Sequence, residues 1–401
     1  MSELERLIQE HCPNGVEFKE LWELTIWDKK FNTVDRHKQN KVCKYNYYLA
    51  ADLKSLEKPN GTVKILTTSI TDLWADEEDV AETLSEGEIV CIPWGGNPIV
   101  QYYKGKFITG DNRIATSIDT TKLNNKFLYY CLLNRLNEIA SFYRGSGIKH
   151  PDMSKVLDLK IPVPPIEVQS EIVRILDNFT ELTAELTAEL QARKKQYEYY
   201  AEKLLSFNDT YDYLPLSDVA DFRNGKGHEK AIVASGKYIV VNSKFISTNG
   251  EVKKYANKQI SPLYSSDILM VMSDLPNGRA LAKTFLVDED DTYTLNQRIC
   301  ALHVKNEDQY MTKFLYFFLN RNSQLLKYDN GVDQTNLKKS DILSVQVPVI
   351  SIETQKSTIS FLERLETLCL DISSGLPAEI EARQKQYEYY RDKLLTFKEL
   401  N

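Results

Sequence analysis

The sequence has few cysteines, and their spacing fits neither a metal site nor a disulfide framework. Six cysteines are scattered over 401 residues without any C-x-x-C pair, which excludes the common zinc-binding arrangements and the dense disulfides of small secreted domains. No apolar run reaches the roughly 18 residues of a candidate membrane span. The polar start MSELERLIQE lacks the apolar stretch of a secretory signal. We therefore expect a cytoplasmic protein with no metal and no membrane contact.

Glycine and proline are also scarce, with 16 and 13 residues. This scarcity excludes a collagen-like or low-complexity chain, and 27% charged with 10% aromatic residues indicates folded domains. At about 150 residues per domain, the length predicts two or three domains.

A surplus of positive charge is missing as well. With 50 basic and 57 acidic residues, the chain as a whole has no electrostatic footprint for nucleic acid. The acidity is uneven, however, because residues 161–210 hold 5 basic and 9 acidic residues, whereas residues 211–346 hold 17 and 16. Total charge therefore does not exclude DNA binding through local basic faces.

Motifs for catalysis are absent too. The Gly225-Lys226-Gly227-His228 tract lacks the spacing of a P-loop. Pro164-Pro165 stands between Val and Ile, which does not match the [DNS]-P-P-[YFW] motif of amino-methyltransferases. No acidic and lysine grouping typical of nucleases stands out. We expect a chain without catalysis or cofactor of its own; an enzyme with a diverged active site is the weaker alternative.

The strongest positive feature is an internal duplication. Residues 192–207 recur as residues 382–397 with 12 of 16 positions identical, and IPVPPIEVQ (161–169) recurs as VPVISIETQ (347–355). The order is therefore globular unit, helix, globular unit, helix. A four-residue echo, FKEL at 18–21 and again at 397–400, hints that the chain ends near the place where the first unit begins.

After Pro164-Pro165, apolar residues recur every three or four positions over roughly 38 residues, which predicts one long amphipathic helix. The second copy has the same stripe, but Gly375 and Pro377 should kink or break it. Two such helices bury their stripes most economically against each other, antiparallel, as a coiled-coil spacer. The alternative is that each helix packs on its own globular unit.

The globular units contain short β-type runs bounded by Gly, Pro, Asn or Asp, which are 63–67, 88–92, 107–109, 238–241, 267–272 and 298–304. Amphipathic helices are expected at 126–140 and 313–326. The predicted fold class is thus α+β, with two globular domains joined by two long antiparallel α-helices in a pseudo-two-fold arrangement. The boundaries are 1–160, 161–207, 208–346 and 347–401.

The duplicated P-x-P-x-x-E-x-Q, followed by a long helix ending in A-R-x-K-Q-Y-E-Y-Y-x-x-K-L-L-x-F, resembles the specificity subunit of type I restriction–modification enzymes. The tandem TAEL units at 183–190 and the SGLPAEIEARQKQYEYYRDKLL tail look like its IC subfamily. The resemblance implies two target-recognition domains, each reading one half of a bipartite double-stranded DNA target. It also implies helices that hold the domains apart and dock two methyltransferase subunits, to which restriction (translocase) subunits add.

In that subfamily the number of TAEL units goes with the length of the unspecified gap. The resemblance therefore makes this tract the spacer, with Thr183, Leu186, Thr187 and Leu190 as its residues; a neutral tract expanded by slippage is the alternative. Half-sites of three to five base pairs, centred one helical turn of about 10 bp apart, leave a gap of about 6 bp.

Loops rich in Lys, Arg, Asn and Gln are the candidates for DNA contact, because these side chains bind phosphates and base edges. In the first domain they are Lys104, Lys106, Asn112, Arg113, Arg144, Lys149 and His150. In the second they are Arg223, Lys226, His228, Lys253, Lys254, Asn277, Arg279, Gln297, Arg298, Gln334 and Asn336. Each could instead belong to an ordinary solvated loop.

Two tyrosines of the long helices, Tyr199 and Tyr389, lie outside the apolar stripe. Since exposed tyrosine suits protein interfaces, we assign both to methyltransferase docking. The main rival to a DNA-reading subunit is a coiled-coil adaptor whose globular ends bind other proteins.

Overall fold

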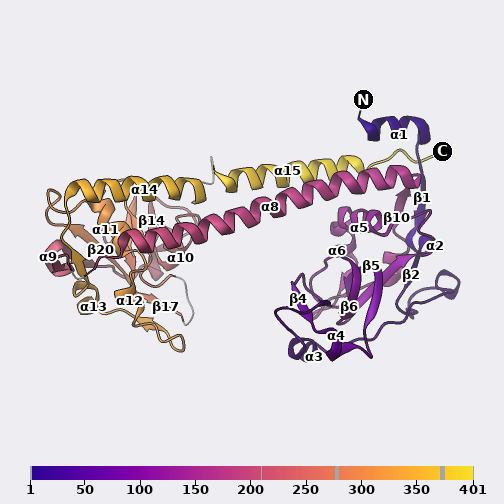
Figure 1. Cartoon of the computed structure of the whole chain (residues 1–401), viewed down its shortest axis with the longest axis horizontal. Helices are drawn as coiled ribbons and strands as arrows, with labels where there is room; N and C mark the ends of the chain where they lie inside the picture. The colour runs from indigo at the N-terminus through magenta and orange to yellow at the C-terminus, as the bar shows by residue number, and fades with distance from the viewer. Residues whose placement is uncertain (1, 209, 276–279, 371–374, 401) are drawn as a thin grey trace. The chain divides into compact units, whose positions relative to one another are not determined.

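The computed structural model describes residues 2–208, 210–275, 280–370 and 375–400. The chain forms two compact units, Met1–Thr187 with Glu379–Asn401 and Ala188–Ala378. Each unit contains a mixed α and β globular domain together with parts of the long helices (Figure 1). The prediction of two α+β domains connected through long helices is confirmed; the domain boundaries drawn from the sequence stay a prediction.

Unit 1 is built around a six-stranded sheet with the order β2-β7-β5-β6-β3-β4. Its strands are β1 (Glu17–Glu20), β2 (Thr25–Trp27), β3 (Val63–Leu66), β4 (Leu73–Ala75), β5 (Ser85–Pro93), β6 (Gln101–Thr109), β7 (Asn112–Ser117), β8 (Tyr143–Arg144), β9 (His150–Pro151) and β10 (Lys160–Val163). Its helices before the long ones are α1 (Glu3–His11), α2 (Leu21–Leu24), η1 (Arg36–Lys38), α3 (Ala50–Ser55), α4 (Glu77–Val80), α5 (Asn125–Asn134), α6 (Leu136–Ser141) and α7 (Met153–Leu157).

Unit 2 contains two four-stranded sheets, with the orders β12-β20-β16-β18 and β13-β15-β14-β19. Its strands are β11 (Tyr213–Pro215), β12 (Ala220–Asn224), β13 (Ile232–Val233), β14 (Tyr238–Val241), β15 (Tyr255–Ala256), β16 (Ile268–Val271), β17 (Ser273–Asp274), β18 (Thr284–Leu286), β19 (Tyr293–Leu295), β20 (Ile299–Val304), β21 (Thr335–Asn336) and β22 (Gln346–Pro348). Its helices are α9 (Leu216–Val219), η2 (Glu229–Ala231), α10 (Ser243–Ser247), α11 (Thr312–Leu319), α12 (Ser323–Leu326), α13 (Lys339–Leu343) and α14 (Ile352–Leu370).

The two units share the central part of one plan. The antiparallel trio β2-β7-β5 of unit 1 corresponds to β12-β20-β16 of unit 2, and the small pair β1-β10 corresponds to β11-β22. Every strand expected from the sequence is present. The expected helices 126–140 and 313–326 are each divided in two, into α5 with α6 and α11 with α12.

The long central helix α8 runs over Ile166–Leu205, 40 residues, and begins directly after Pro165 as expected. Its start is part of the unit 1 core, where Ile172 and Leu176 are fully buried. Its last residues pack on the core of unit 2 through Tyr197 and Leu204. The packing of each helix end on a globular domain is the arrangement that the sequence left as the alternative.

Each end of α8 also contacts a helix of the second copy. In unit 1 the rings of Phe179 and Tyr390 stack with centroids 5.3 Å apart, and Tyr390 belongs to α15 (Leu376–Leu394). In unit 2 the rings of Tyr200 and Phe361 meet edge to face at 6.0 Å, and Phe361 belongs to α14. Helix–helix pairing therefore accompanies packing on the domains.

The glycine and proline of the second copy mark a helix boundary. Gly375 lies in a bend, and α15 begins at Leu376, so that Pro377 stands in the first turn, where proline is tolerated. Residues 371–374, which precede this bend, lie outside the described residues. Among the described residues, no helix is long and apolar enough to cross a membrane.

The repeated glutamine of the two motifs is a buried connector. Gln169 accepts a hydrogen bond from the backbone N–H of Asn124 (2.9 Å) and donates to the carbonyls of Lys122 and Pro164 (2.7 Å each). Gln355 occupies the same place in unit 2, and both side chains are fully buried. Each glutamine thus ties the start of a long helix to the loop before a domain helix.

The four-residue echo has a structural counterpart. Val16 pairs in parallel with Glu399, where the N–H of Val16 donates to the carbonyl of Lys398 (2.9 Å) and that of Leu400 to the carbonyl of Val16 (3.0 Å). The end of the chain therefore lies beside the beginning of the first domain, within unit 1, as the echo suggested.

Candidate nucleic-acid interface

In unit 2, three chain segments meet where the strands of the first sheet end. This end of the strands is called the sheet edge below. Strand β12 ends at Asn224, opposite Cys300, and β16 ends at Val271, opposite Ile299, so that β20 begins where its two neighbours stop. The segments that meet at this edge are the loop after β12, the turn before β20 and the small β17–β21 pair. Loops held by strand ends are a common place for binding residues.

Five of the predicted DNA-contacting residues gather there and are exposed, namely Lys226, Gln297, Arg298, Gln334 and Asn336. Lys226 pairs with Asn296 as an isolated parallel bridge, and the carbonyl of Arg298 accepts the N–H of Met272 (2.9 Å). Gln334 donates to the hydroxyl of Ser273 (2.7 Å). Residues more than 100 positions apart in sequence therefore share one polar surface.

His228 requires a correction, because it is 1% exposed and cannot reach a ligand outside the protein. Its Nδ1 lies 2.6 Å from the carbonyl of Lys226, and its Nε2 lies 2.9 Å from the hydroxyl of Thr294. The imidazole thus pins the loop after β12 to β19. Its role is to hold Lys226 in place.

The other predicted residues of unit 2 lie elsewhere. Arg223 is on β12, where it pairs with the buried carboxylate of Asp267 and donates to the carbonyl of Pro262 (3.0 Å). Lys253 and Lys254 are exposed just before β15, in the second sheet. Asn277 and Arg279 lie outside the described residues.

Unit 1 has the same edge at the same place in its sheet. Strand β5 ends at Pro93, opposite Asn112 of β7, and the N–H of Asp28, directly after β2, donates to the carbonyl of Ile114 (2.9 Å). The β8–β9 pair joins this edge, because the N–H of Gly96 donates to the carbonyl of Lys149 (3.0 Å). In unit 2 the β17–β21 pair likewise connects the residues directly after β16 to a segment that follows the domain helices.

Three predicted residues of unit 1 are exposed at this edge, Arg144, Lys149 and His150. The Nδ1 of His150 lies 2.7 Å from the carbonyl of Trp94, and the two rings are 5.3 Å apart. On the other side, the ammonium of Lys29 lies 5.3 Å from the centre of the same indole. Trp94 therefore forms the apolar centre of a basic surface.

Asn112 and Arg113 are the second correction, because both are at most 1% exposed. Arg113 forms an ion pair with Asp28 (2.9 Å), which is itself buried, and another with Asp111. Its guanidinium lies between the rings of Trp94 (4.8 Å) and Tyr47 (5.5 Å). Arg113 supports the surface from within and is not positioned to read bases.

The hydroxyl of Tyr47 belongs to the same network, since it donates to Asp28 (2.5 Å). Burial, and then this hydrogen bond to a carboxylate, raise the pKa of Tyr47 well above its ordinary value. The ring is thus a neutral donor over the whole physiological range.

Lys104 and Lys106 are not brought to this edge. Both lie on β6, opposite the first half of β5, where Lys104 pairs with Glu88 (3.5 Å) and Lys106 with Glu77 (2.6 Å). Conversely, reasoning from the sequence missed Trp94 and Lys29. A signal for Lys29 was present, because it opens the most lysine-rich stretch of the first domain.

The helical candidates are placed as their pattern suggested. Tyr199 and Tyr389 are 59% and 60% exposed, the two most exposed tyrosines among the described residues. In the TAEL tract, Thr183 and Thr187 donate to the carbonyls four residues earlier in the helix (2.8 and 2.7 Å), and Leu186 and Leu190 are half-buried. The threonine hydroxyls are therefore satisfied within α8.

Comparisons with known proteins agree over most of the chain. Residues 32–193 and 208–382 each match the family model described as the type I restriction modification DNA specificity domain. The chain is 33% identical over 312 residues to the specificity subunit of the Escherichia coli type I restriction enzyme EcoR124I/EcoR124II, covering 71% of this chain and 74% of that protein.

Solved structures show the same fold at low sequence identity. The S subunit of a type I restriction–modification system from M. genitalium superposes with a TM-score of 0.56 at 17% identity, covering 95% of this chain and 96% of that one. A chain from a study of the assembly of a type I system superposes with a TM-score of 0.54 at 12% identity, covering 96% and 98%. Both superpositions extend over nearly the whole chain, so the two structures share its fold.

Proposed function

Because the chain belongs to the type I restriction–modification DNA specificity family, we propose that it is the non-catalytic subunit that reads a two-part double-stranded DNA target. The observation that carries the proposal is the repeated sheet edge, at which exposed Lys, Arg and His side chains gather in unit 1 and exposed Lys, Arg, Asn and Gln side chains gather in unit 2. Two copies of one reading surface in one chain fit two half-sites. In unit 1 the surface is centred on Trp94, and in unit 2 on Arg298.

The exposed side chains divide by chemistry. Gln297, Arg298, Gln334 and Asn336 have the donors and acceptors that read base edges in the major groove, whereas Lys149 and Lys226 suit phosphates. Both kinds are needed, because phosphate contacts set the register in which base contacts discriminate.

We further propose that the helices dock two methyltransferase subunits, to which restriction subunits add. Tyr199 and Tyr389 occupy corresponding places in the repeat, and each lies off the apolar stripe with more than half of its surface exposed. A duplicated pair of exposed aromatic residues suits two copies of one partner.

The test is to co-express the chain with its cognate methyltransferase and to map methylated bases across the host genome. We expect one motif made of two specified parts separated by an unspecified gap of about 6 bp, the gap expected for half-sites centred one turn apart. Methylation at a single uninterrupted motif, or none, would contradict the proposal.

Deleting Thr187–Leu190 tests the spacer. A four-residue unit advances a helix by about 6 Å and rotates it about 40° past one full turn, so its removal keeps a continuous helix. We expect the gap in the methylated motif to shorten while both half-sites stay the same. Replacing Thr187 by Ala, which changes the tract without changing the length of the helix, is the control and should leave the gap unchanged. An altered half-site in the Thr187–Leu190 deletion would refute the spacer role.

Replacing Arg298 by Ala tests the reading surface of unit 2. Its side chain is exposed, so the fold should tolerate the change, while loss of a bidentate base contact costs about 1–3 kcal/mol of discrimination. We expect relaxed specificity at one position of one half-site and an unchanged second half-site, measured by the same methylation map. Relaxation in both half-sites, or in neither, would exclude Arg298 as a base-reading residue.

A further inference from the structure

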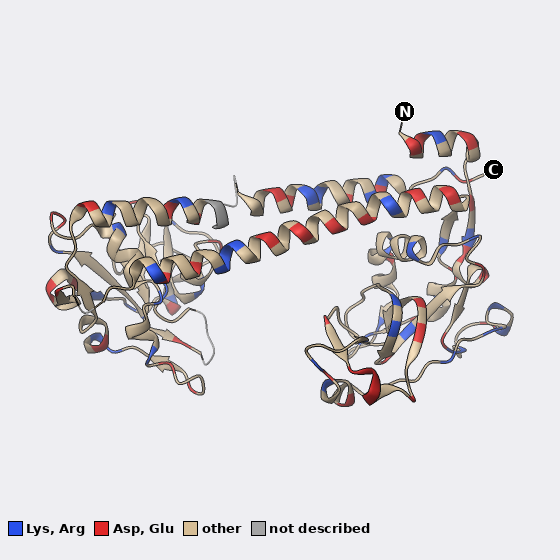
Figure 2. Cartoon of the chain, in the orientation of Figure 1, with Lys and Arg blue, Asp and Glu red and all other residues tan. Residues whose placement is uncertain are grey.

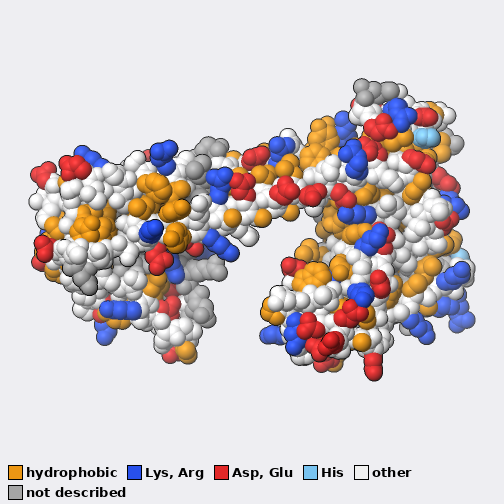
Figure 3. Space-filling model, in the orientation of Figure 1, with side chains coloured by type: hydrophobic (Ala, Val, Ile, Leu, Met, Phe, Trp, Pro, Cys, Tyr) orange, Lys and Arg blue, Asp and Glu red, His pale blue; other side chains and the backbone are white. Residues whose placement is uncertain are grey.

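The most basic segment of the first domain follows β2 and was not among the residues singled out from the sequence. Residues 29–44 contain six Lys or Arg residues and a single acidic residue, Asp35. Figure 2 shows several blue stretches of backbone on the loop beyond β2, and the space-filling view in Figure 3 shows blue side chains standing out on the same side of the unit. This segment is called the basic loop below.

The basic loop has a built internal structure. Its ends meet, because Trp27 and Val42 lie side by side and the N–H of Cys43 donates to the carbonyl of Trp27 (2.9 Å). Inside it, the side chain of Gln39 accepts from the N–H of Phe31 (2.7 Å) and donates to the carbonyl of Lys29 (2.9 Å). Closed ends and buried side chains of its own are the features of an Ω-loop.

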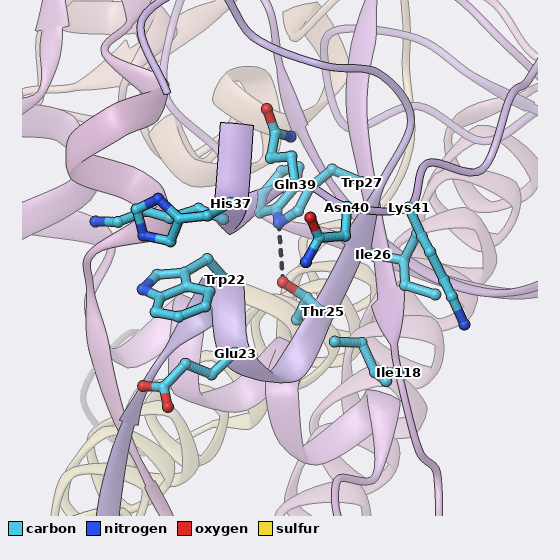
Figure 4. Close-up of a pocket in the computed structure, with 11 residues that line it drawn as sticks. Trp22, Glu23, Thr25, Ile26, Trp27, His37, Gln39, Asn40, Lys41 and Ile118 are labelled. Atoms are coloured by element: carbon cyan, nitrogen blue, oxygen red, sulfur yellow. Dashed lines mark hydrogen bonds between the residues drawn. The ribbon is translucent and has the colours of Figure 1, made fainter. Parts of the chain in front are cut away.

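A cavity of about 280 Å³ separates the inner side of the loop from the strand and helix beneath it. Figure 4 shows Asn40 and Lys41 on one side of it and Trp22 with Glu23 on the other, with His37 above the indole of Trp22. The rings of Trp22 and His37 meet edge to face at 5.6 Å. The loop is thus held at its ends and by its own buried residues.

Five of its cations are exposed: Lys29, Lys30, Arg36, Lys41 and Lys44. Within the part of the chain that the structure describes, none of the five forms an ion pair, whereas the half-buried Lys38 pairs with Asp158. The positive charge of the loop is therefore not neutralised by the protein itself. Cations held close together on an ordered backbone attract an anionic partner at little entropic cost.

We propose that the basic loop is a second DNA contact of unit 1, which binds the phosphate backbone beside the half-site without reading its sequence. The loop directly follows Asp28, on the edge that carries the reading surface, and its first lysine, Lys29, lies against Trp94. In unit 2 the loop after the corresponding strand β12 is also basic, with Lys226 and Lys230 exposed. The inference rests on the proposed function.

The composition of the loop favours a phosphate backbone over an acidic protein. Its large apolar residues, Phe31 and Val34, are 7% exposed each and point into the domain. Protein interfaces are centred on buried apolar or aromatic residues and depleted in lysine, and the outer side of this loop has the opposite composition. Lysines without an apolar centre are typical of contacts to DNA phosphates.

The test variant replaces Arg36, Lys41 and Lys44 by Gln in the full chain, co-purified with its methyltransferase. The matched control replaces Lys54, Lys58 and Lys122, three exposed lysines of the same unit, by Gln. Binding to a duplex carrying the mapped motif and to one without it is measured from 50 to 300 mM salt, roughly the range over which phosphate contacts weaken.

We expect the loop variant to bind both duplexes roughly tenfold more weakly near 0.1 M salt. The negative slope of log K against log salt should become less steep by about 0.9 for each lost phosphate contact. The methylated motif should stay the same, and the control should match the wild type. Equal slopes in the variant and control would overturn the inference, as would loss of methyltransferase co-purification without a change in slope. Failure of the wild type to prefer its motif duplex would instead overturn the proposed function.

Discussion

Replacing Arg113 by Met is expected to destabilise unit 1 by about 3–5 kcal/mol, the cost typical of removing one partner of a buried ion pair. Methionine keeps the length of the side chain, so the loss measures charge and hydrogen bonding more than volume. The substitution leaves Asp28, which is 2% exposed, with the hydroxyl of Tyr47 and the N–H of Ile114 as its remaining donors. It also removes the cation between the rings of Trp94 and Tyr47.

The four tryptophans make the measurement specific, because all of them, at 22, 27, 74 and 94, lie in unit 1. Urea unfolding followed by tryptophan fluorescence therefore reports unit 1 alone. Arg113→Lys is the control, and we expect it to lose less, since it keeps the charge but not the fork of donors. A midpoint for Arg113→Met equal to that of the wild type would contradict the prediction.

The Arg113→Met variant also tests whether Arg113 only supports the reading surface of unit 1 or itself contacts bases. Under conditions in which Arg113→Met is folded, we expect the first half-site of the methylated motif to keep its sequence, because the guanidinium is buried. A changed base in that half-site would show that Arg113 does contribute to base reading.

Replacing Gln169 by Leu should destabilise unit 1 by roughly 2–4 kcal/mol, because it leaves one backbone N–H and two carbonyls without their side-chain partner, and each unsatisfied buried group costs about 1–3 kcal/mol. Leucine has a similar size, so little cavity forms. The effect is larger than that of an ordinary surface change, since Gln169 is fully buried.

Gln355→Leu is the matched control that the duplication supplies. We expect Gln169→Leu to lower the tryptophan-detected midpoint, and Gln355→Leu to leave it in place while reducing hydrogen-exchange protection in α11 and α14. If both variants shift the tryptophan transition equally, the two glutamines do not act within separate units.

The repeat explains why so much of the fold could be predicted. The two glutamines, the prolines before them and the long stripes are local or duplicated signals, so the positions of the strands and the start of α8 could be expected from spacing alone. The packing of the helix ends on the domains could not, because the same apolar stripe can bury itself against a helix or a sheet. The residues Ile172 and Leu176 carry no sign of which partner they meet.

In the candidate site, too, local sequence patterns predict some features, while others depend on tertiary packing. Arg144, Lys149 and Arg298 stay predicted DNA contacts and are exposed, and the sequence singles them out because positive residues near a strand end are a local pattern. Arg113 and His228 were assigned to the surface for the same reason and are buried, since a polar residue beside a strand end looks the same in sequence whether it faces solvent or Asp28. Trp94 was missed because a lone tryptophan in a loop has no periodicity.

The sequence by itself determined the duplication, the long helices and the family, because identity between two segments of one chain and the period of an apolar stripe are properties of the string of residues. Which polar residues are buried and which are exposed was decided only by the tertiary structure. Asp28 and Arg113 are 85 residues apart, and whether they neutralise each other depends on the register of β2 against β7. Lys41 and Lys44 are left for an external partner because, among the described residues, no carboxylate forms an ion pair with them.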